Sequence, residues 1–511
     1  MAKKKYILLI IFLIFSIKSF TQKKEIVEIK FPPIILENIE TEIHFLFKEK
    51  ISDKKDFPIL INKNQIFLEI KNQKAILKKK FISKGKIIFE INGQKIEKKI
   101  SPIPLWFSIL PPFFAILIAL IFQEVFVALF VGIWSGTFII FFYNQENIFF
   151  AFFKSLFAVV DNYFIRSLNN ESHLSIIIFS MLIGGMVGII TKNGGMKGVV
   201  NFLSKYANTR KSGQLITWLL GIAIFFDDYA NTLVVGNTMR AVTDKLKISR
   251  EKLAYIVDST AAPVVSIAFV TTWIGAELSY IQDGINVLGI KESAYSVFIN
   301  SLRFSFYPIF TLIFILLLIL LEKDFGPMYT AEKKAIKLKT IKKSAKIDKK
   351  KFLSEKWYNA FFPVLTIIFG TLCGLLYTGW NQEVWDNENI NFLSKISNII
   401  GNSNSYKSLI WASLLGVVLS IFMTISQKIM SLKDTIESLI GGFKLMFSTI
   451  LILSLAWSLA YITEDLHTAD FISNNLIELN VSPYYMPALT FILSAMVAFS
   501  TGSSWGTMAI I

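Results

Sequence analysis

Two adjacent carboxylates, Asp227 and Asp228, lie inside an apolar segment that runs from residue 215 to residue 235. Placing a charge near the centre of a bilayer costs at least about 2.5–3.5 kcal/mol on insertion scales. A carboxylate pair kept in such a segment therefore indicates a cation or proton site, unless a neighbouring group neutralises it. Asn231 follows Asp227 by four residues and shares its helix face. The alternative is an ordinary helix end, at which Asp228 caps the helix and Asp227 is solvated.

A third carboxylate, Asp258, opens the sequence DSTAAP at residues 258–263. Because Pro263 has no backbone N–H, it frees the carbonyl of Ser259 beside a carboxylate and two hydroxyls. We expect Asp258, Ser259 and Thr260 to belong to the ion or proton path. The alternative is a kinked helix whose hydroxyls satisfy its own backbone.

The segment 501–507, TGSSWGT, is small, hydroxyl-rich and interrupted by glycine. Paired broken segments in two halves of a chain point to a transporter site. Ser503, Ser504 and Thr507 are therefore candidates for a second-half site.

Other polar positions interrupt the apolar runs. Glu124 is equally consistent with a solvated turn and with a functional role, and Glu277 is expected at the membrane interface. Thr271 and Thr272 could line a cavity. Residues 463–468, TEDLHT, resemble an extracellular helix end as much as a site.

The elements that carry these residues are those of an all-α polytopic membrane protein. The chain has 511 residues, 53% of them hydrophobic, with a mean hydropathy of +0.54. Its apolar runs are at or near membrane-spanning length. They cover residues 108–122, 126–142, 174–190, 252–273, 304–321, 360–377, 409–423, 445–462 and 486–499.

Basic residues set the expected topology, because cytoplasmic loops are rich in Lys and Arg. Both flanks of the 215–235 segment are basic, so we expect a broken or re-entrant segment that dips into the membrane and returns. Residues 144–172 are expected outside. The loop 322–356, with twelve lysines and five acidic residues, is expected inside.

The N-terminal hundred residues differ from the rest. Residues 1–22 resemble a signal peptide, with a basic start and an apolar core. Residues 23–100 predict a small β-rich extracytoplasmic domain, with strands at 25–31, 42–47, 65–70, 74–77 and 86–91. The membrane domain then covers residues 101–511, and we expect it to be truncated at its C-terminus.

Composition excludes several classes of function. The net charge of +16 fits lysine-rich membrane loops better than nucleic-acid binding. Cys373 is the only cysteine, the three histidines are scattered, and no Walker A loop is present, so neither a disulfide framework nor ATP-driven transport by this chain alone is expected. We expect no enzyme activity and no cofactor. Membrane lipid is the expected partner, and homo-oligomerisation is left open.

Three motifs resemble the NhaC-type Na⁺/H⁺ antiporter family. They are FFDDYANTLVVGNTMR at residues 225–240, SREKLAYIVDSTAAP at 249–263 and TGSSWGT at 501–507. The resemblance implies two repeated halves with broken helices in a bacterial cytoplasmic membrane, and secondary antiport of sodium for protons.

On this basis we expect Asp227, Asp228 and Asp258 to bind either Na⁺ or protons. Asn231, Ser259, Thr260, Ser503 and Thr507 would add neutral oxygens. Closely spaced buried carboxylates favour protonation of one of them, and sodium can then displace that proton. Two alternatives remain: an organic-anion exchanger of the malate or lactate type on the same scaffold, and a non-transporting membrane sensor.

Overall fold

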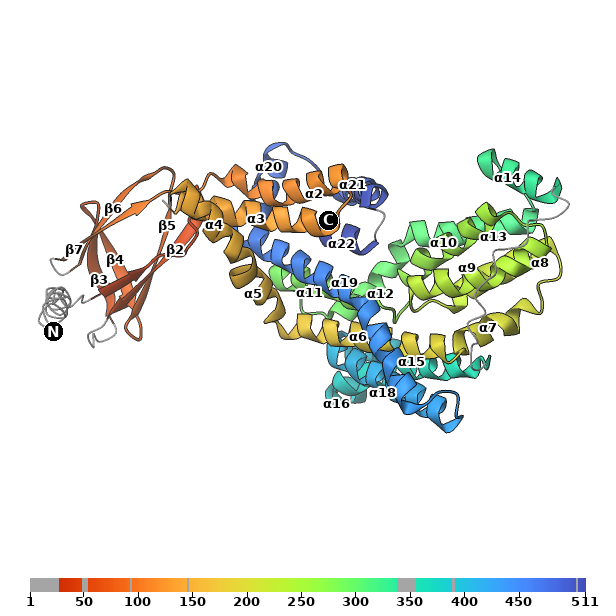
Figure 1. The fold of residues 1–511 in the computed structure, drawn as a ribbon. Helices are drawn as coiled ribbons and strands as arrows, with labels where there is room; N and C mark the ends of the chain where they lie inside the picture. The colour runs from red at the N-terminus through yellow and green to blue at the C-terminus, as the bar shows by residue number, and fades with distance from the viewer. Residues whose placement is uncertain are drawn as a thin grey trace, which may run out of the picture. The chain divides into compact units, whose positions relative to one another are not determined.

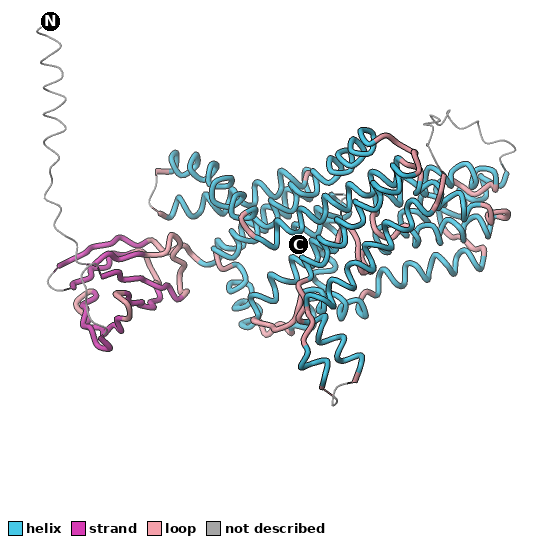
Figure 2. Tube along the Cα trace, turned by 90° about the horizontal axis from the view of Figure 1, so that it is seen from below, coloured by secondary structure: helices cyan, strands magenta, loops and turns pink. Residues whose placement is uncertain are grey.

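The computed structural model describes residues 27–47, 54–91, 94–144, 147–337, 355–387, 391–501 and 504–511. The chain divides into two compact units. The first comprises Met1–Phe164, Ala456–Gly502 and Ile510–Ile511, and the second comprises Ile165–Leu455 and Ser503–Ala509. Among the described residues, strands occur only in the first unit and helices in both (Figure 1, Figure 2). The predicted signal peptide lies outside the described residues.

The β-rich part of the first unit has two antiparallel sheets. The strands are β1 Val27–Lys30, β2 Glu40–Phe47, β3 Lys54–Ile61, β4 Asn64–Ile70, β5 Lys74–Lys80, β6 Gly85–Ile91 and β7 Gln94–Ile100. One sheet has the order β1-β2-β5 and the other β4-β3-β6-β7. Alternate residues of both sheets enter one apolar core, in which Phe45 of β2 and Phe89 of β6 are fully buried.

The sequence predicted five of these strands and missed β3 and β7. Pro58 weakens the strand pattern in β3, since proline cannot donate to a sheet. β7 reads QKIEKKI, and its charged residues hide its alternation.

Helices complete the first unit. They are η1 Leu105–Ile109, α2 Leu110–Phe122, α3 Val125–Tyr143, α4 Ile148–Ala158, the π-helix η2 Val159–Phe164, α20 Thr468–Glu478, η4 Pro483–Tyr485 and α21 Met486–Thr501. The Ser500 hydroxyl of α21 lies 3.0 Å from the backbone oxygens of Ala119 and Leu120, which joins α21 to α2. Glu124 is exposed in the short turn between α2 and α3, as expected for a solvated turn residue.

The first unit corrects one part of the predicted topology. Residues 144–172 were expected to form an outer connection, but Ile148–Leu168 is helical and apolar enough to cross a membrane. Asp161 and Arg166 interrupt the apolar pattern of this helix and conceal it in the sequence.

The second unit is helical throughout its described residues. Its elements are α5 Ile165–Leu168, α6 Glu171–Lys192, α7 Gly195–Ser204, α8 Arg210–Ala223, α9 Asp228–Lys245, α10 Arg250–Val265, α11 Ile274–Leu288, α12 Ala294–Ser301, η3 Leu302–Phe304, α13 Phe306–Leu321, α14 Gly326–Lys337, α15 Tyr358–Thr378, α16 Gln382–Asp386, α17 Phe392–Gly401, α18 Ser405–Ser426 and α22 Ser504–Ile510. The helix α19 Leu432–Asp465 begins in this unit and ends in the first. Glycines allow close helix contacts, because a Cβ on Gly442 of α19 would overlap the backbone of Gly184 in α6.

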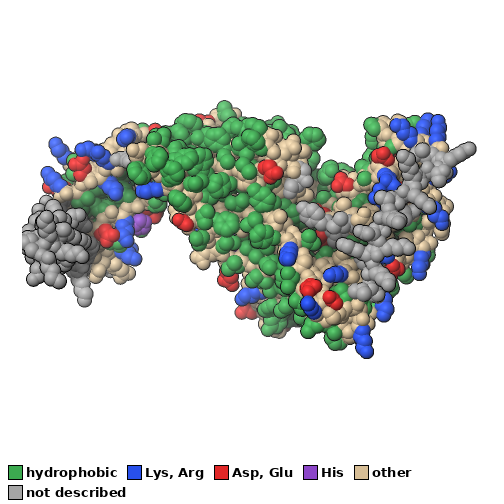
Figure 3. Space-filling view, in the orientation of Figure 1, with side chains coloured by type: hydrophobic (Ala, Val, Ile, Leu, Met, Phe, Trp, Pro, Cys, Tyr) green, Lys and Arg blue, Asp and Glu red, His purple; other side chains and the backbone are tan. Residues whose placement is uncertain are grey.

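Eight helices in the described part are long and apolar enough to cross a membrane, or nine if the bent pair Ala294–Phe304 and Phe306–Leu321 is one span. All the predicted apolar runs except 252–273 fall within them. Large hydrophobic side chains are exposed along these helices, for example Phe113, Phe149 and Phe422. Figure 3 shows hydrophobic side chains gathered over a broad part of one face. The chain is therefore a multi-span membrane protein, as its composition predicts.

Helices α8 and α9 form a hairpin in which the start of α8 contacts the residues just after α9. The Thr209 side chain caps α8 in a reciprocal pair with Ser212. The Arg210 guanidinium, at the start of α8, donates to the backbone oxygen of Lys247, just beyond α9. Gly213 leaves room there for Leu246. The two basic flanks of the 215–235 segment thus lie together, and residues 224–227 form the tip of the hairpin.

The predicted span 252–273 is not one continuous helix. α10 ends at Val265, residues 266–273 are irregular, and α11 begins at Ile274. The irregular residues read SIAFVTTW, so the break carries no glycine or charge that would reveal it in the sequence.

The predicted basic loop 322–356 also holds more structure than expected. α14 occupies Gly326–Lys337 and places Glu332 in a buried position, 4% exposed. The Glu332 carboxylate accepts from the Arg210 side chain and, at 2.7 Å, from the Ser249 backbone N–H. The nearby Lys252 ammonium, 1% exposed, pairs with Asp324. These residues lie at the base of the α8–α9 hairpin, and we call them the base cluster. The base cluster joins α14 to the starts of α8 and α10, and it comprises Arg210, Ser249, Lys252, Asp324 and Glu332.

Candidate functional site

The tip of the α8–α9 hairpin holds the carboxylate pair. α8 ends at Ala223, and Ile224 leaves helical geometry while its N–H still bonds to Leu220. Asp227 is 3% exposed in the connection, and the half-buried Asp228 is the first residue of α9. The capping alternative placed Asp227 in solvent, whereas the structure encloses it. An acid in the first turn also suits the positive end of a helix dipole.

Asn231 closes this tip. Its side-chain amide donates to the backbone oxygens of Gly221 at 2.7 Å and Ile224 at 3.2 Å. Those carbonyls belong to the last turn of α8 and to the capping residue after it, where the helix offers no further N–H partners. The Asn231 backbone N–H donates to the Asp227 carbonyl at 3.0 Å. The buried Asn231 Oδ1 has no hydrogen-bond partner within the described part of the chain, so an acceptor oxygen is available next to the carboxylates.

The irregular segment 266–273, between α10 and α11 (the second break), contacts the tip of the α8–α9 hairpin. The Thr272 backbone N–H donates to the Phe226 carbonyl at 3.0 Å. The Thr271 hydroxyl accepts from the N–H groups of Trp273 and Ile274 and so caps α11. Two irregular segments, 224–227 and 266–273, are therefore joined at one point in the second unit.

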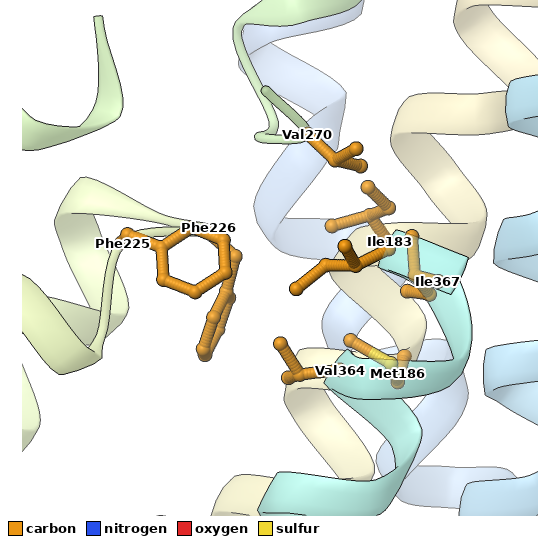
Figure 4. Close-up of a pocket in the computed structure, with 8 residues that line it drawn as sticks. Ile183, Met186, Phe225, Phe226, Val270, Val364 and Ile367 are labelled. Atoms are coloured by element: carbon orange, nitrogen blue, oxygen red, sulfur yellow. The ribbon is translucent and has the colours of Figure 1, made fainter. Parts of the chain in front are cut away.

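A small apolar cavity lies beside this joint. Phe225 and Phe226 face it from the hairpin tip and Val270 from the second break, opposite side chains of α6 and α15 (Figure 4). The lining residues on α6 and α15 are Ile183, Met186, Val364, Ile367 and Ile368. The carboxylates thus have an apolar flank that keeps water away from one side of the tip.

Asp258 and Thr260 lie on different faces of α10. Thr260 is fully buried, its hydroxyl donates to the Ile256 carbonyl at 2.7 Å, and a Cβ on Gly221 of α8 would overlap it. Asp258 precedes Thr260 by two residues, which is about 200° around a helix. Asp258 is accordingly exposed and points away from the Thr260–Gly221 contact, while Ser259 is half-buried between them.

The three predicted sodium-binding carboxylates do not form one group here. Among the described residues, which include Asp227, Asp228 and Asp258, no three His, Cys, Asp or Glu side chains gather as metal ligands would. The structure brings Asp227, Asp228 and Asn231 together at the tip and places Thr260 against α8.

The C-terminal motif approaches the second break. Ser503 lies outside the described residues. Ser504 begins α22, Trp505 is 4% exposed, and Thr507 is half-buried. The rings of Trp505 and Trp273 lie edge to face with centroids 6.3 Å apart. The motif at 501–507 therefore reaches the start of α11, a connection that the sequence alone did not predict.

Two further polar positions named from the sequence, the 463–468 segment and Glu277, lie outside the hairpin tip. Asp465, in the 463–468 segment of the first unit, accepts a 2.9 Å hydrogen bond from the Tyr163 hydroxyl. The sequence left open whether this segment is a helix end or a site; α19 ends at Asp465. Glu277, which we expect at the membrane interface, is half-buried in the first turn of α11, and its Oε2 is fully enclosed.

The fold defines a multi-span membrane protein, and its second unit holds a pair of adjacent aspartates at the tip of the α8–α9 hairpin. Residues 264–511 match the model of the Na⁺/H⁺ antiporter family, which is a family of transporters and not of enzymes. The match begins after the first two motifs, so it includes TGSSWGT but not the three predicted carboxylates. The chain is also 28% identical over 404 residues to an uncharacterized protein of Haemophilus influenzae, covering 79% of this chain and 75% of that protein. Among solved structures, none matches the chain.

Proposed function

We propose that this protein exchanges Na⁺ for H⁺ across a bacterial cytoplasmic membrane, and that Asp227 and Asp228 hold either ion in turn. The supporting observation is the 3% exposure of Asp227 beside a second carboxylate at the hairpin tip. Burial of a carboxylate favours its neutral form or its pairing with a cation. The antiporter family match over residues 264–511 makes ion exchange the consistent outcome.

Sodium prefers oxygen ligands, and the tip offers them. The enclosed Asn231 Oδ1 has no partner among the described residues and lies next to the pair. We assign Asp258, Ser259 and Thr260 to the path along α10, with Asp258 on its exposed side. Ser503, Ser504 and Thr507 are assigned to the second half of the same path.

The membrane arrangement follows from the hairpin. With both ends of α8–α9 at a basic face, the segment enters the membrane and returns to the cytoplasmic side. We propose that the 501–507 segment is its counterpart in a second half of the chain. The β-rich domain then lies outside the membrane as an accessory domain.

The test is Na⁺-driven proton flux in proteoliposomes. Wild type should show proton movement when a Na⁺ gradient is imposed, and Asp227→Asn and Asp228→Asn should each reduce it at least about tenfold, because a neutral amide cannot exchange a proton for a cation. The matched control is Asp386→Asn, which changes an exposed aspartate that accepts from Gln382.

Undiminished flux in both tip variants would contradict the proposal. Malate or lactate counterflow without sodium dependence would instead favour the organic-anion exchanger. Equal loss in Asp386→Asn would show that the effect is not specific to the tip.

A further inference from the structure

One face of α11 carries buried polar atoms that the hairpin site does not use. Trp273, Glu277 and Tyr280 follow one another at spacings of four and three residues, so they share a helix face. Within the described residues, Trp273 Nε1, Glu277 Oε2 and the Tyr280 hydroxyl are all enclosed and have no hydrogen-bond partner. Trp273 is 5% exposed. Leaving a buried polar atom without a partner costs about 1–3 kcal/mol, so three on one face indicate a ligand.

Among the described residues, no cation is paired with the Glu277 carboxylate. α11 packs against α6 and α12, and the Tyr406 hydroxyl of α18 donates to the Leu278 carbonyl. None of the ion pairs among the described residues includes Glu277. The titratable groups on α11 and on the elements packed against it are Tyr280, Asp283, Glu171, His173, Lys192, Tyr295, Tyr406 and Lys407. The two lysines lie at helix ends, at the last residue of α6 and in the first turn of α18.

The α11 face that carries Trp273, Glu277 and Tyr280 lies near the segments of the proposed ion path. The backbone bond from Thr272 to Phe226 joins the start of α11 to the hairpin tip. Trp273 touches Trp505 of the C-terminal motif. Glu277 follows Trp273 by about one helical turn. It therefore lies close to both interrupted segments without belonging to either.

We infer that Glu277 is a proton-binding residue of the transport path, distinct from the carboxylate pair at the hairpin tip. This inference rests on the proposed function. The Glu277 carboxyl is neutral while it holds a proton, and it releases that proton to water when a hard monovalent cation reaches the site. The Tyr280 hydroxyl is a further oxygen ligand, and the Trp273 ring can face the cation. The charge of the site is the same before and after the exchange.

The experiment compares two activities of the full chain in proteoliposomes. Na⁺-driven proton flux requires proton exchange, whereas ²²Na⁺/Na⁺ counterflow at equal pH requires only sodium movement. Glu277→Gln should retain counterflow within about twofold and lose proton flux at least about tenfold, because glutamine cannot release a proton. Glu292→Gln, at an exposed glutamate after α11, should leave both activities unchanged.

A second variant tests whether a loss of proton flux in Glu277→Gln comes from misfolding. Glu277→Asp keeps a titratable carboxyl and should retain proton flux with a shifted pH profile. Wild-type proton flux in Glu277→Gln, or a wild-type pH profile in Glu277→Asp, would overturn the inference while leaving the proposed function intact. Wild-type vesicles without either activity would overturn the proposed function and the inference with it.

Discussion

At the scale of single residues, the structure adds a structural role for Asn231 that the sequence did not predict. Its spacing from Asp227 predicted a neutral ion ligand, and its Oδ1 remains available for that role. The structure adds that its amide donates to the last carbonyls of α8. The residue that would coordinate the ion also holds the tip in shape.

We predict that Asn231→Ala destabilises the protein. The carbonyls of Gly221 and Ile224 would lose their donors, at a cost of about 1–3 kcal/mol for each buried group. Thermal unfolding in detergent should show a lower midpoint for this variant. The control is Asn286→Ala, an exposed asparagine that accepts from Gln282, which should change stability by no more than about 0.5 kcal/mol. Equal midpoints for the two variants would contradict the assigned role.

The sequence could predict part of the site for identifiable reasons. Asp227 and Asp228 interrupt an apolar run, and such interruptions are visible without a structure. The enclosure of the Glu277 Oε2 was not predicted, because a single acid after an apolar run looks the same at an interface as in an enclosed helix turn. The contact between Trp273 and Trp505 joins residues that are far apart in the chain, and no local pattern encodes it.

At the scale of elements, the two breaks were not equally predictable. For the 215–235 segment, basic residues at both ends predicted that the chain turns back, and the ends of α8 and α9 do lie together; its re-entry into the membrane stays a prediction. The break at 266–273 was not predicted, because apolar and β-branched residues fill it and its contacts come from distant residues: the Thr272 N–H donates to the Phe226 carbonyl, and the Tyr295 hydroxyl donates to the Phe269 carbonyl. The helix at Ile148–Leu168 was missed for the opposite reason, since Asp161 and Arg166 lie inside it.

We predict that Gly221→Ala disrupts the packing of α8 on α10. A Cβ at this position would overlap the buried Thr260 hydroxyl, so one helix must move. Na⁺-driven proton flux should fall severalfold and the unfolding midpoint should drop. Gly284→Ala is the matched control, because a Cβ there meets no atom within 4 Å and α11 gains a better helix former. Similar losses in both variants would argue against a specific contact.

The base cluster should hold α14 in place. Glu332→Gln removes the charge that pairs with Arg210 from a side chain that is only 5% exposed. Because breaking a buried pair leaves the partner charge uncompensated, we expect faster hydrogen exchange over Gly326–Lys337 and a loss of about 1–3 kcal/mol, less than for a fully buried pair because Arg210 is partly exposed. The exposed neighbour Glu322, changed to Gln, should leave exchange there as in wild type. Unchanged exchange in Glu332→Gln would mean that other contacts hold α14.

At the scale of the whole molecule, the proposal fixes which segments share a side of the membrane. We predict that Lys205→Cys and Lys245→Cys, in a Cys373→Ser background, react with an impermeant maleimide only from the cytoplasmic side. Both lysines are exposed and flank the hairpin, whose ends meet through Arg210. Lys84→Cys, at an exposed turn of the β-rich domain, should react only from outside. Opposite labelling of positions 205 and 245 would mean that α8–α9 crosses the membrane.

The most direct test of the central claim is the affinity of the purified full chain for Na⁺ as a function of pH, measured by calorimetry. If Na⁺ and H⁺ compete for the oxygens of Asp227 and Asp228, affinity must weaken as pH falls, by about tenfold per pH unit wherever one proton occupies the site. Asp227→Asn should abolish most of this dependence. A sodium affinity in the wild type that does not change with pH would contradict the account.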